Sequence, residues 1–201
     1  MSRGKPAVWL DIPRLAVFPN FLSDDECDYL VERAKPKLTR STVVAGEDKL
    51  DMVHEGRTSS GCCFERGETE KITTIERKLA MLTATPLENG EGLQVLRYEE
   101  DQYYRPHHDY FDPTLPGYDK YLERGGQRLY TVIMYLNDDF DQGETEFPIL
   151  RMLIPPIKGS ALVFANVAPN GRIDDQTLHG GREPKNGTKY IATKWIRQGV
   201  Y

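Results

Sequence analysis

The chain has 201 residues, of which 39% are hydrophobic and 28% are charged, as is usual for a soluble globular protein. Its 26 basic and 31 acidic residues give a formal charge of −5, and no dense run of lysine and arginine indicates a nucleic-acid surface. No segment approaches about 18 consecutive apolar residues, so we expect no membrane span. Three cysteines make no disulfide framework, and no signal peptide is visible, so we expect a cytoplasmic location.

Two helices are predicted in the first half of the chain. Ser23 and Glu26 have the spacing of a capping box, which predicts a helix that runs to about Ala34, before Pro36. Apolar residues at helical spacing predict a second helix over about 68–82.

From residue 92 onward the pattern changes to that of β-strands. Apolar and β-branched runs predict strands over 93–98, 129–136, 161–165 and 189–196, separated by turns rich in Gly, Pro, Asn and Asp. Many short strands of this kind are typical of an antiparallel sandwich or barrel. We therefore expect an α+β fold in one domain, residues 1–201. Helical support over about 1–90 would precede a double-stranded β-helix (jelly roll) core over about 91–201.

The segment 104–111 contains a histidine and a carboxylate two positions apart. In a strand, His107 and Asp109 would leave the same face and His108 would face the other way. With one more histidine they would form the 2-His-1-carboxylate triad of non-haem Fe(II) oxygenases. His179 has the best setting for that third position, although a His-x-Asp pair alone is a weak signal.

The surroundings of this pair carry a more specific resemblance. The run 98–111 resembles the metal-binding segment of prolyl 4-hydroxylases, which belong to the 2-oxoglutarate- and Fe(II)-dependent dioxygenases. Further blocks follow the order of that family, at 57–60, 125–128 with 134–137, 143–148, and 179–181 with 187–195. Two positions depart from it: Gln142 replaces a glycine, and the segment 181–185 replaces a Gly-Cys-Pro-Val sequence.

The resemblance implies that His107, Asp109 and His179 are Fe(II) ligands, with 2-oxoglutarate and O2 as cosubstrates and ascorbate as reductant. It also implies that Lys189 binds the distal carboxylate of 2-oxoglutarate and that Tyr98 and Thr145 donate hydrogen bonds to it. The pattern of the last strand agrees, because Lys189 shares one face with Ile191, Thr193 and Trp195, and a buried ammonium needs an anion. The alternative for this lysine is a strand end at which it reaches water.

The substrate is less clearly marked. The resemblance places Arg128, Tyr104 and Trp195 near the substrate, and a polar segment over 44–56 lies where the family has a substrate-covering loop. Core packing for Tyr104, an ion pair for Arg128 and an ordinary surface loop remain as alternatives.

Three functions remain open from the sequence. The first is hydroxylation of an unactivated C–H, at C4 of prolyl residues in a protein or peptide, with release of succinate and CO2. The second keeps this chemistry on another side chain, a free amino acid or a small metabolite. The third is a non-catalytic jelly-roll binding module. No nucleic-acid or membrane partner is expected, and the oligomeric state stays open.

Overall fold

A computed structural model describes residues 5–41 and 56–201. In this part of the chain the α-helices are α1 (Asp24–Ala34), α2 (Glu70–Thr83) and α3 (Asp119–Glu123). The strands are β1 (Val8–Leu10), β2 (Leu15–Phe18), β3 (Thr39–Arg40), β4 (Ser60–Phe64), β5 (Leu93–Tyr98), β6 (Tyr104–His107), β7 (Arg128–Tyr135), β8 (Asp141–Gln142), β9 (Thr145–Phe147), β10 (Met152–Ile154), β11 (Ala161–Ala165), β12 (His179–Gly181), β13 (Pro184–Lys185) and β14 (Lys189–Arg197).

The ends of the two long helices follow from their caps. The Ser23 hydroxyl accepts from the Glu26 amide, and the Glu26 carboxylate accepts from the Ser23 amide, so α1 has the predicted capping box and the predicted bounds. Helix α2 begins two residues later than predicted, because the Thr69 side chain caps it by accepting from the Ile72 amide.

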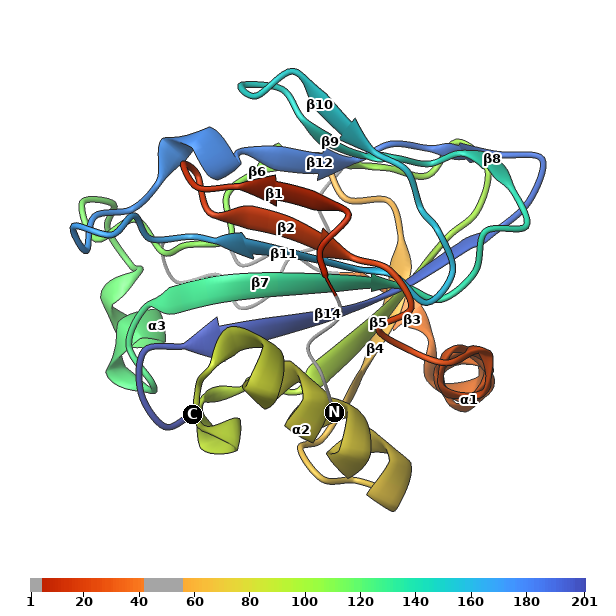
Figure 1. Cartoon of the computed structure of the whole chain (residues 1–201), viewed down its shortest axis with the longest axis horizontal. Coiled ribbons are helices and arrows are strands. Elements are labelled where there is room, and N and C mark those ends of the chain that lie inside the picture. Colours follow the sequence, from red (N-terminus) through yellow and green to blue (C-terminus); the bar gives the residue numbers. More distant parts are fainter. Residues whose placement is uncertain (1–4, 42–55) are drawn as a thin grey trace.

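Two antiparallel sheets face each other. The large sheet has the strand order β1-β2-β11-β7-β14-β5-β4-β3, and the small sheet has the order β10-β9-β12-β6. Figure 1 shows the small sheet above the large one and the helices α1 and α2 below it. The α+β prediction with a double-stranded β-helix core is therefore confirmed.

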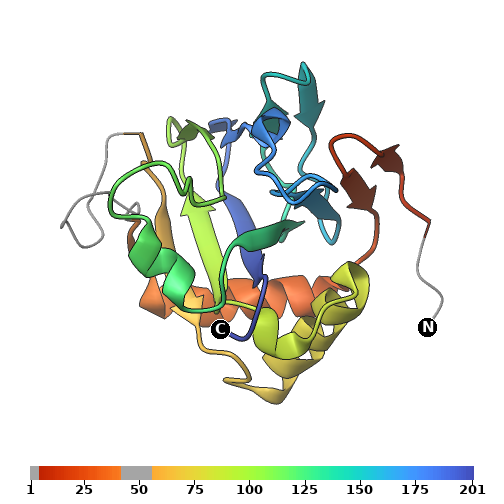
Figure 2. The same ribbon diagram turned by 90° about the vertical axis from the view of Figure 1, so that its left-hand side faces the viewer.

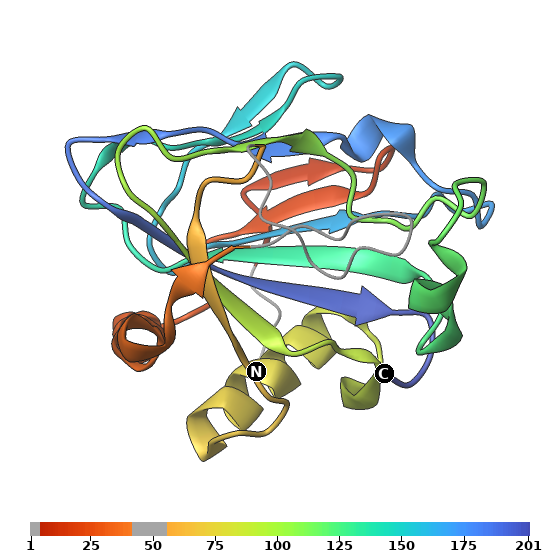
Figure 3. The same ribbon diagram turned by 180° about the vertical axis from the view of Figure 1, so that it is seen from behind.

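Alternation along the central strands of the large sheet produces two apolar layers. Val95, Val132 and Met134 lie on one face and pack with residues of the two helices, including Leu30 and Ile75. The residues next to them in sequence point into the space between the sheets, where they pack with the small sheet; this inner layer includes Leu96, Ile133, Phe147, Phe164 and Ile191. Figures 2 and 3 show α1 and α2 together on the outer face of the large sheet. The inner face is thus left for the site.

The first 90 residues differ from the expected helical support, since they also contribute four strands to the large sheet. Strand β2 pairs with β11, and β4 pairs with β5. Most of these strands have only two to four residues, too few for a period-two pattern to distinguish them from loops. Among the described residues no helix is long and apolar enough to cross a membrane.

Candidate metal centre

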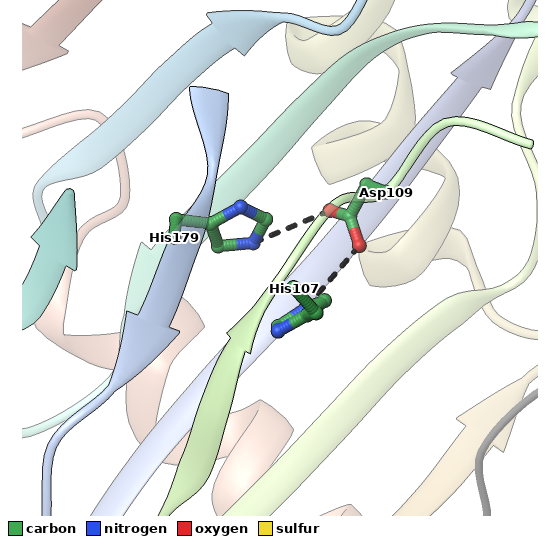
Figure 4. A group of neighbouring side chains, drawn as sticks. All are labelled: His107, Asp109 and His179. Carbon is green, nitrogen blue, oxygen red and sulfur yellow. Dashed lines mark ion pairs between the residues drawn. The ribbon is translucent and has the colours of Figure 1, made fainter. Parts of the chain in front are cut away.

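Two neighbouring antiparallel strands of the small sheet bring the two predicted histidine ligands together. His107 is the last residue of β6, His179 is the first residue of β12, and the two are direct cross-strand partners. Asp109 lies in a bend two residues beyond His107, outside the strand in which the sequence analysis expected it. Figure 4 shows its carboxylate nevertheless pointing at both imidazoles. The carboxylate thus reaches both histidines although Asp109 lies outside the strand.

The three side chains converge on one point. Their ligand atoms all lie within 4.8 Å of one another. The Nε2 atoms of His107 and His179 lie 3.5 and 3.6 Å from the two carboxylate oxygens of Asp109. Two imidazoles and one carboxylate on one side of a cavity are the donor set that non-haem Fe(II) takes in oxygenases. The residues present therefore fit an Fe(II) ion.

Backbone carbonyls fix the tautomer of each histidine. The Nδ1–H group of His107 donates to the Arg105 carbonyl at 2.9 Å, and that of His179 donates to the Thr177 carbonyl at 3.0 Å. Each Nε2 lone pair is then directed at the centre of the cluster, as is usual for metal-binding histidines.

The protonation states also suit a metal ion. Burial lowers the pKa of His179 to about 4, and its proximity to His107 acts in the same direction. Burial acts to raise the pKa of Asp109, but the two neighbouring imidazoles outweigh it and hold that pKa well below its usual value. At neutral pH the centre thus offers a neutral imidazole and an ionised carboxylate, the forms that bind metals.

A cavity opens beside the triad and holds most of the other predicted site residues. Its lining includes the triad together with Tyr98, Tyr104, Thr145, Lys189 and Trp195. Ile191 and Thr193 also line it, so the predicted face of β14 is confirmed. Arg57 lines it as well. The sequence analysis used Arg57 only as part of a family block and assigned it no role.

Lys189 is a buried cation in this cavity. It is 1% exposed, and its Nζ atom lies 5.2 Å from the centre of the Tyr98 ring. No ion pair to Lys189 forms within residues 5–41 and 56–201. Burial lowers its pKa to about 7, an effect that nearby Glu144 partly offsets. An anionic ligand in the cavity would restore the charge of this lysine.

Tyr98 and Thr145 line the cavity of the lysine from opposite sheets. Tyr98 is the cross-strand partner of Lys189 in the large sheet. Thr145, in β9 of the small sheet, shares a 2.8 Å hydrogen bond with the Tyr135 hydroxyl. Nothing in the sequence placed Tyr135 of β7 near the site, and only the structure shows its hydroxyl beside Thr145.

The three predicted substrate residues have different surroundings. Tyr104 stacks on His107 with ring centres 3.6 Å apart. The Arg57 guanidinium lies 4.8 Å from the centre of the same Tyr104 ring. Arg128 does not line the cavity; it forms a buried ion pair with Glu91 at 2.7 and 2.9 Å. Its guanidinium lies 3.9 Å from the centre of the Trp195 ring. Arg128 therefore forms the ion pair that was the alternative to substrate binding. Its contact with substrate stays a prediction.

Two other expectations concern residues outside the triad. His108 turns away from the centre, as predicted, and its Nε2–H group donates to the Asp175 carbonyl at 3.0 Å. The candidate covering loop at 44–56 lies, except for its last residue, outside the described residues.

Comparison with known proteins identifies the family of this chain. The sequence model of the 2OG-Fe(II) oxygenase superfamily matches residues 93–197. Prolyl 4-hydroxylase 1 of Arabidopsis thaliana is 41% identical over 209 residues, which cover 96% of this chain and 72% of that protein.

Solved structures agree with this assignment. A viral collagen prolyl hydroxylase from Paramecium bursaria Chlorella virus 1, in its 2-oxoglutarate complex, matches with a TM-score of 0.71 and 33% identity over 91% of this chain and 95% of that chain. A prolyl hydroxylase from Trichoplax adhaerens, in complex with a hypoxia-inducible factor peptide fragment, has a TM-score of 0.67 at 18% identity over 94% and 86% of the two chains, which shows the fold alone. Since identity near 40% extends over almost the whole sequence, the chain belongs to the prolyl 4-hydroxylase family of 2-oxoglutarate- and Fe(II)-dependent dioxygenases.

Proposed function

We propose that this enzyme hydroxylates C4 of prolyl residues in a protein or peptide, and that it consumes 2-oxoglutarate and O2 and releases succinate and CO2. The observation that carries the proposal is the shared cavity of the His107, Asp109 and His179 triad and the buried ammonium of Lys189. A binding module has no need for an anion site beside such a triad. The names of the relatives support prolyl residues as the target.

The triad and the lysine divide the work of binding. His107, Asp109 and His179 would hold Fe(II) through two imidazoles and one carboxylate. Lys189 pairs with the distal carboxylate of 2-oxoglutarate, and Tyr98 and Thr145 orient that carboxylate through their hydroxyl groups. When bound, Fe(II), 2-oxoglutarate and O2 supply the oxidising power for the C–H bond. The contribution of the protein is to place the target carbon and to exclude water.

The walls of the cavity suit a pyrrolidine ring. Tyr104 and Trp195 give it two aromatic surfaces next to the triad. Proline-rich segments bind aromatic surfaces well because their extended conformation is already ordered. These two residues are therefore the proposed contacts for the substrate.

The substrate test compares three candidate acceptors. The purified protein is incubated with Fe(II), 2-oxoglutarate, and either a proline-rich peptide, the same peptide with alanine in place of proline, or free proline. The expected result is the gain of one oxygen atom on the proline-rich peptide alone, with 4-hydroxyproline in its hydrolysate and an equal amount of succinate. Oxygen gained only by free proline, or by the alanine peptide, contradicts the proposed substrate.

We also propose ascorbate as the reductant that restores the enzyme after turnovers without substrate, on the basis of family resemblance. In its absence, the rate of succinate release should decay within one time course, and ascorbate added later should restore it. A constant rate without ascorbate contradicts this role.

A further inference from the structure

Asp109 is held differently from the two histidines of the triad. His107 and His179 are fixed by a strand pair, whereas Asp109 lies in a bend after β6. Backbone pairing in the small sheet therefore does not determine the rotation of its carboxylate. Other contacts must set the direction of this group, because a metal site requires its ligands in a defined orientation before the ion binds.

Strand β7 supplies those contacts. The Thr131 hydroxyl donates to Oδ2 of Asp109 at 2.8 Å. Three residues earlier in the same strand, the Arg128 guanidinium donates to the backbone carbonyl of Asp109 at 3.4 Å. One strand of the large sheet thus contacts both the side chain and the backbone of the aspartate.

Asn166 determines the direction of the threonine hydrogen bond. It follows β11, and its Nδ2 group donates to Oγ1 of Thr131 at 2.9 Å. A hydroxyl group has one hydrogen, so a threonine that accepts from Asn166 keeps that hydrogen for Asp109. The opposite orientation of the amide would take this hydrogen and turn an oxygen lone pair toward the carboxylate, which is repulsive.

The burial of these hydrogen bonds indicates that they have a role beyond packing. Thr131 and Asn166 are both 0% exposed, and Oδ1 of Asn166 has no hydrogen-bond partner in the described part of the protein. An incompletely paired amide in the core destabilises the fold relative to an apolar side chain of the same size. The Nδ2 group of this amide is hydrogen-bonded to Thr131, which in turn donates to the Asp109 carboxylate of the triad.

We propose that Thr131 and Asn166 are positioning residues for the metal-binding carboxylate, an inference that rests on the proposed Fe(II) site. Together they fix the plane of the Asp109 carboxylate and occupy Oδ2 with a hydrogen bond. Oδ1, which receives no hydrogen bond from Thr131, would then be the oxygen available to the metal ion. Neither residue touches the metal or the substrate.

The test measures metal binding in the absence of 2-oxoglutarate, with Co(II) as a spectroscopic replacement for Fe(II). Thr131→Val keeps the shape of the side chain and removes the hydroxyl. It should weaken Co(II) binding by about ten- to a hundred-fold, the usual effect of losing a hydrogen bond to a metal ligand, and should change the visible absorption of bound Co(II). Thr131→Ser keeps the hydroxyl and should restore both the affinity and the spectrum. Asn166→Leu should weaken binding in the same direction as Thr131→Val.

A matched control separates positioning from general destabilisation. Ser160→Ala removes another buried hydroxyl, one that donates to the Ile157 carbonyl away from the cavity, and should leave Co(II) affinity unchanged. Circular dichroism checks that each variant is folded. Wild-type affinity and spectrum in folded Thr131→Val overturn the positioning role, while the Fe(II) site stands. Failure of the wild-type protein to bind Co(II) or Fe(II) overturns the proposed function and, with it, this inference.

Discussion

The cross-strand pair of His107 and His179 joins segments that are more than 70 residues apart in the sequence. Replacing His179 with alanine leaves one histidine and one carboxylate, too few protein ligands to hold Fe(II) in the open three-ligand arrangement. We expect His179→Ala to reduce succinate formation to the background rate, measured by chromatography. His108→Ala is the matched control, since this histidine faces away and donates to the Asp175 carbonyl. Equal activity of His179→Ala and the wild type would contradict the assigned ligand.

The charge of Lys189 makes cosubstrate binding depend on pH. Burial lowers its pKa to about 7 in the free protein, and a bound carboxylate raises that pKa again. Above about pH 7 the free enzyme must therefore take up a proton when the dicarboxylate binds. The dissociation constant of 2-oxoglutarate should rise with pH, by up to about ten-fold per pH unit between about pH 7 and pH 9. Anaerobic calorimetry in the presence of Fe(II) measures this constant.

The control for this prediction is Lys189→Arg. A guanidinium stays protonated throughout that pH range, so the dissociation constant of this variant should change little with pH, even if its affinity is lower. A flat profile for the wild type, or the same slope in both proteins, contradicts the assignment of Lys189 as the titrating group.

At the scale of elements, one face of β14 lines the cavity and the other packs against the helices. Between the cavity residues Thr193 and Trp195, Lys194 points to the opposite face and forms a 2.6 Å ion pair with Glu76 of α2. Both side chains are almost completely buried, at 2% and 1% exposure. The pair fixes α2 to the strand that carries Lys189.

Removing one member of this pair leaves a buried charge without its partner. Lys194→Met should lower the free energy of unfolding by about 3–5 kcal/mol, measured by urea denaturation. Adding Glu76→Gln should recover most of that loss, because the amide is neutral and its oxygen still accepts from the Gly67 amide, which Glu76 does in the wild type. A double variant no more stable than Lys194→Met would show that the ion pair itself is the stabilising interaction.

At the scale of the whole molecule, the large sheet combines strands from both ends of the chain. β2 pairs with β11, and β4 pairs with β5, so in residues 91–201 alone β11 and β5 each lose one of their two neighbouring strands, and one apolar face of the sheet loses its helices. We expect this fragment to show no cooperative thermal transition by circular dichroism and to bind a hydrophobic dye, unlike the full chain. A cooperative transition, together with Co(II) binding by the fragment, would show that the later strands form an independent unit.

What could be predicted from the sequence depends on the range of the interaction. The capping box of α1 and the long strands were predicted correctly, because local hydrogen bonds and side-chain alternation determine them. The short strands before residue 90 were missed, since long-range pairing stabilises them and their own residues carry little pattern.

The candidate site shows the same division. Family motifs led to the triad residues and Lys189, and the structure brings them to one cavity. The bend at Asp109 was not foreseen, because alternation within a strand was the only local argument. The burial of Arg128 against Glu91 and the contact of Thr131 with Asp109 depend on partners 37 and 22 residues away, which no local pattern reveals.

The two halves of the cavity belong to different sheets: His107 and His179 to the small sheet, and Lys189 to the large one. The separation of the sheets is maintained by inner residues such as Phe147 and Phe164, whose rings meet edge to face at 5.4 Å. We expect this separation to limit the chain length of the diacid that fits between the triad and Lys189. We expect a smaller ring at either position to bring the sheets closer together and to favour a keto diacid shorter than 2-oxoglutarate, although neither ring lines the cavity.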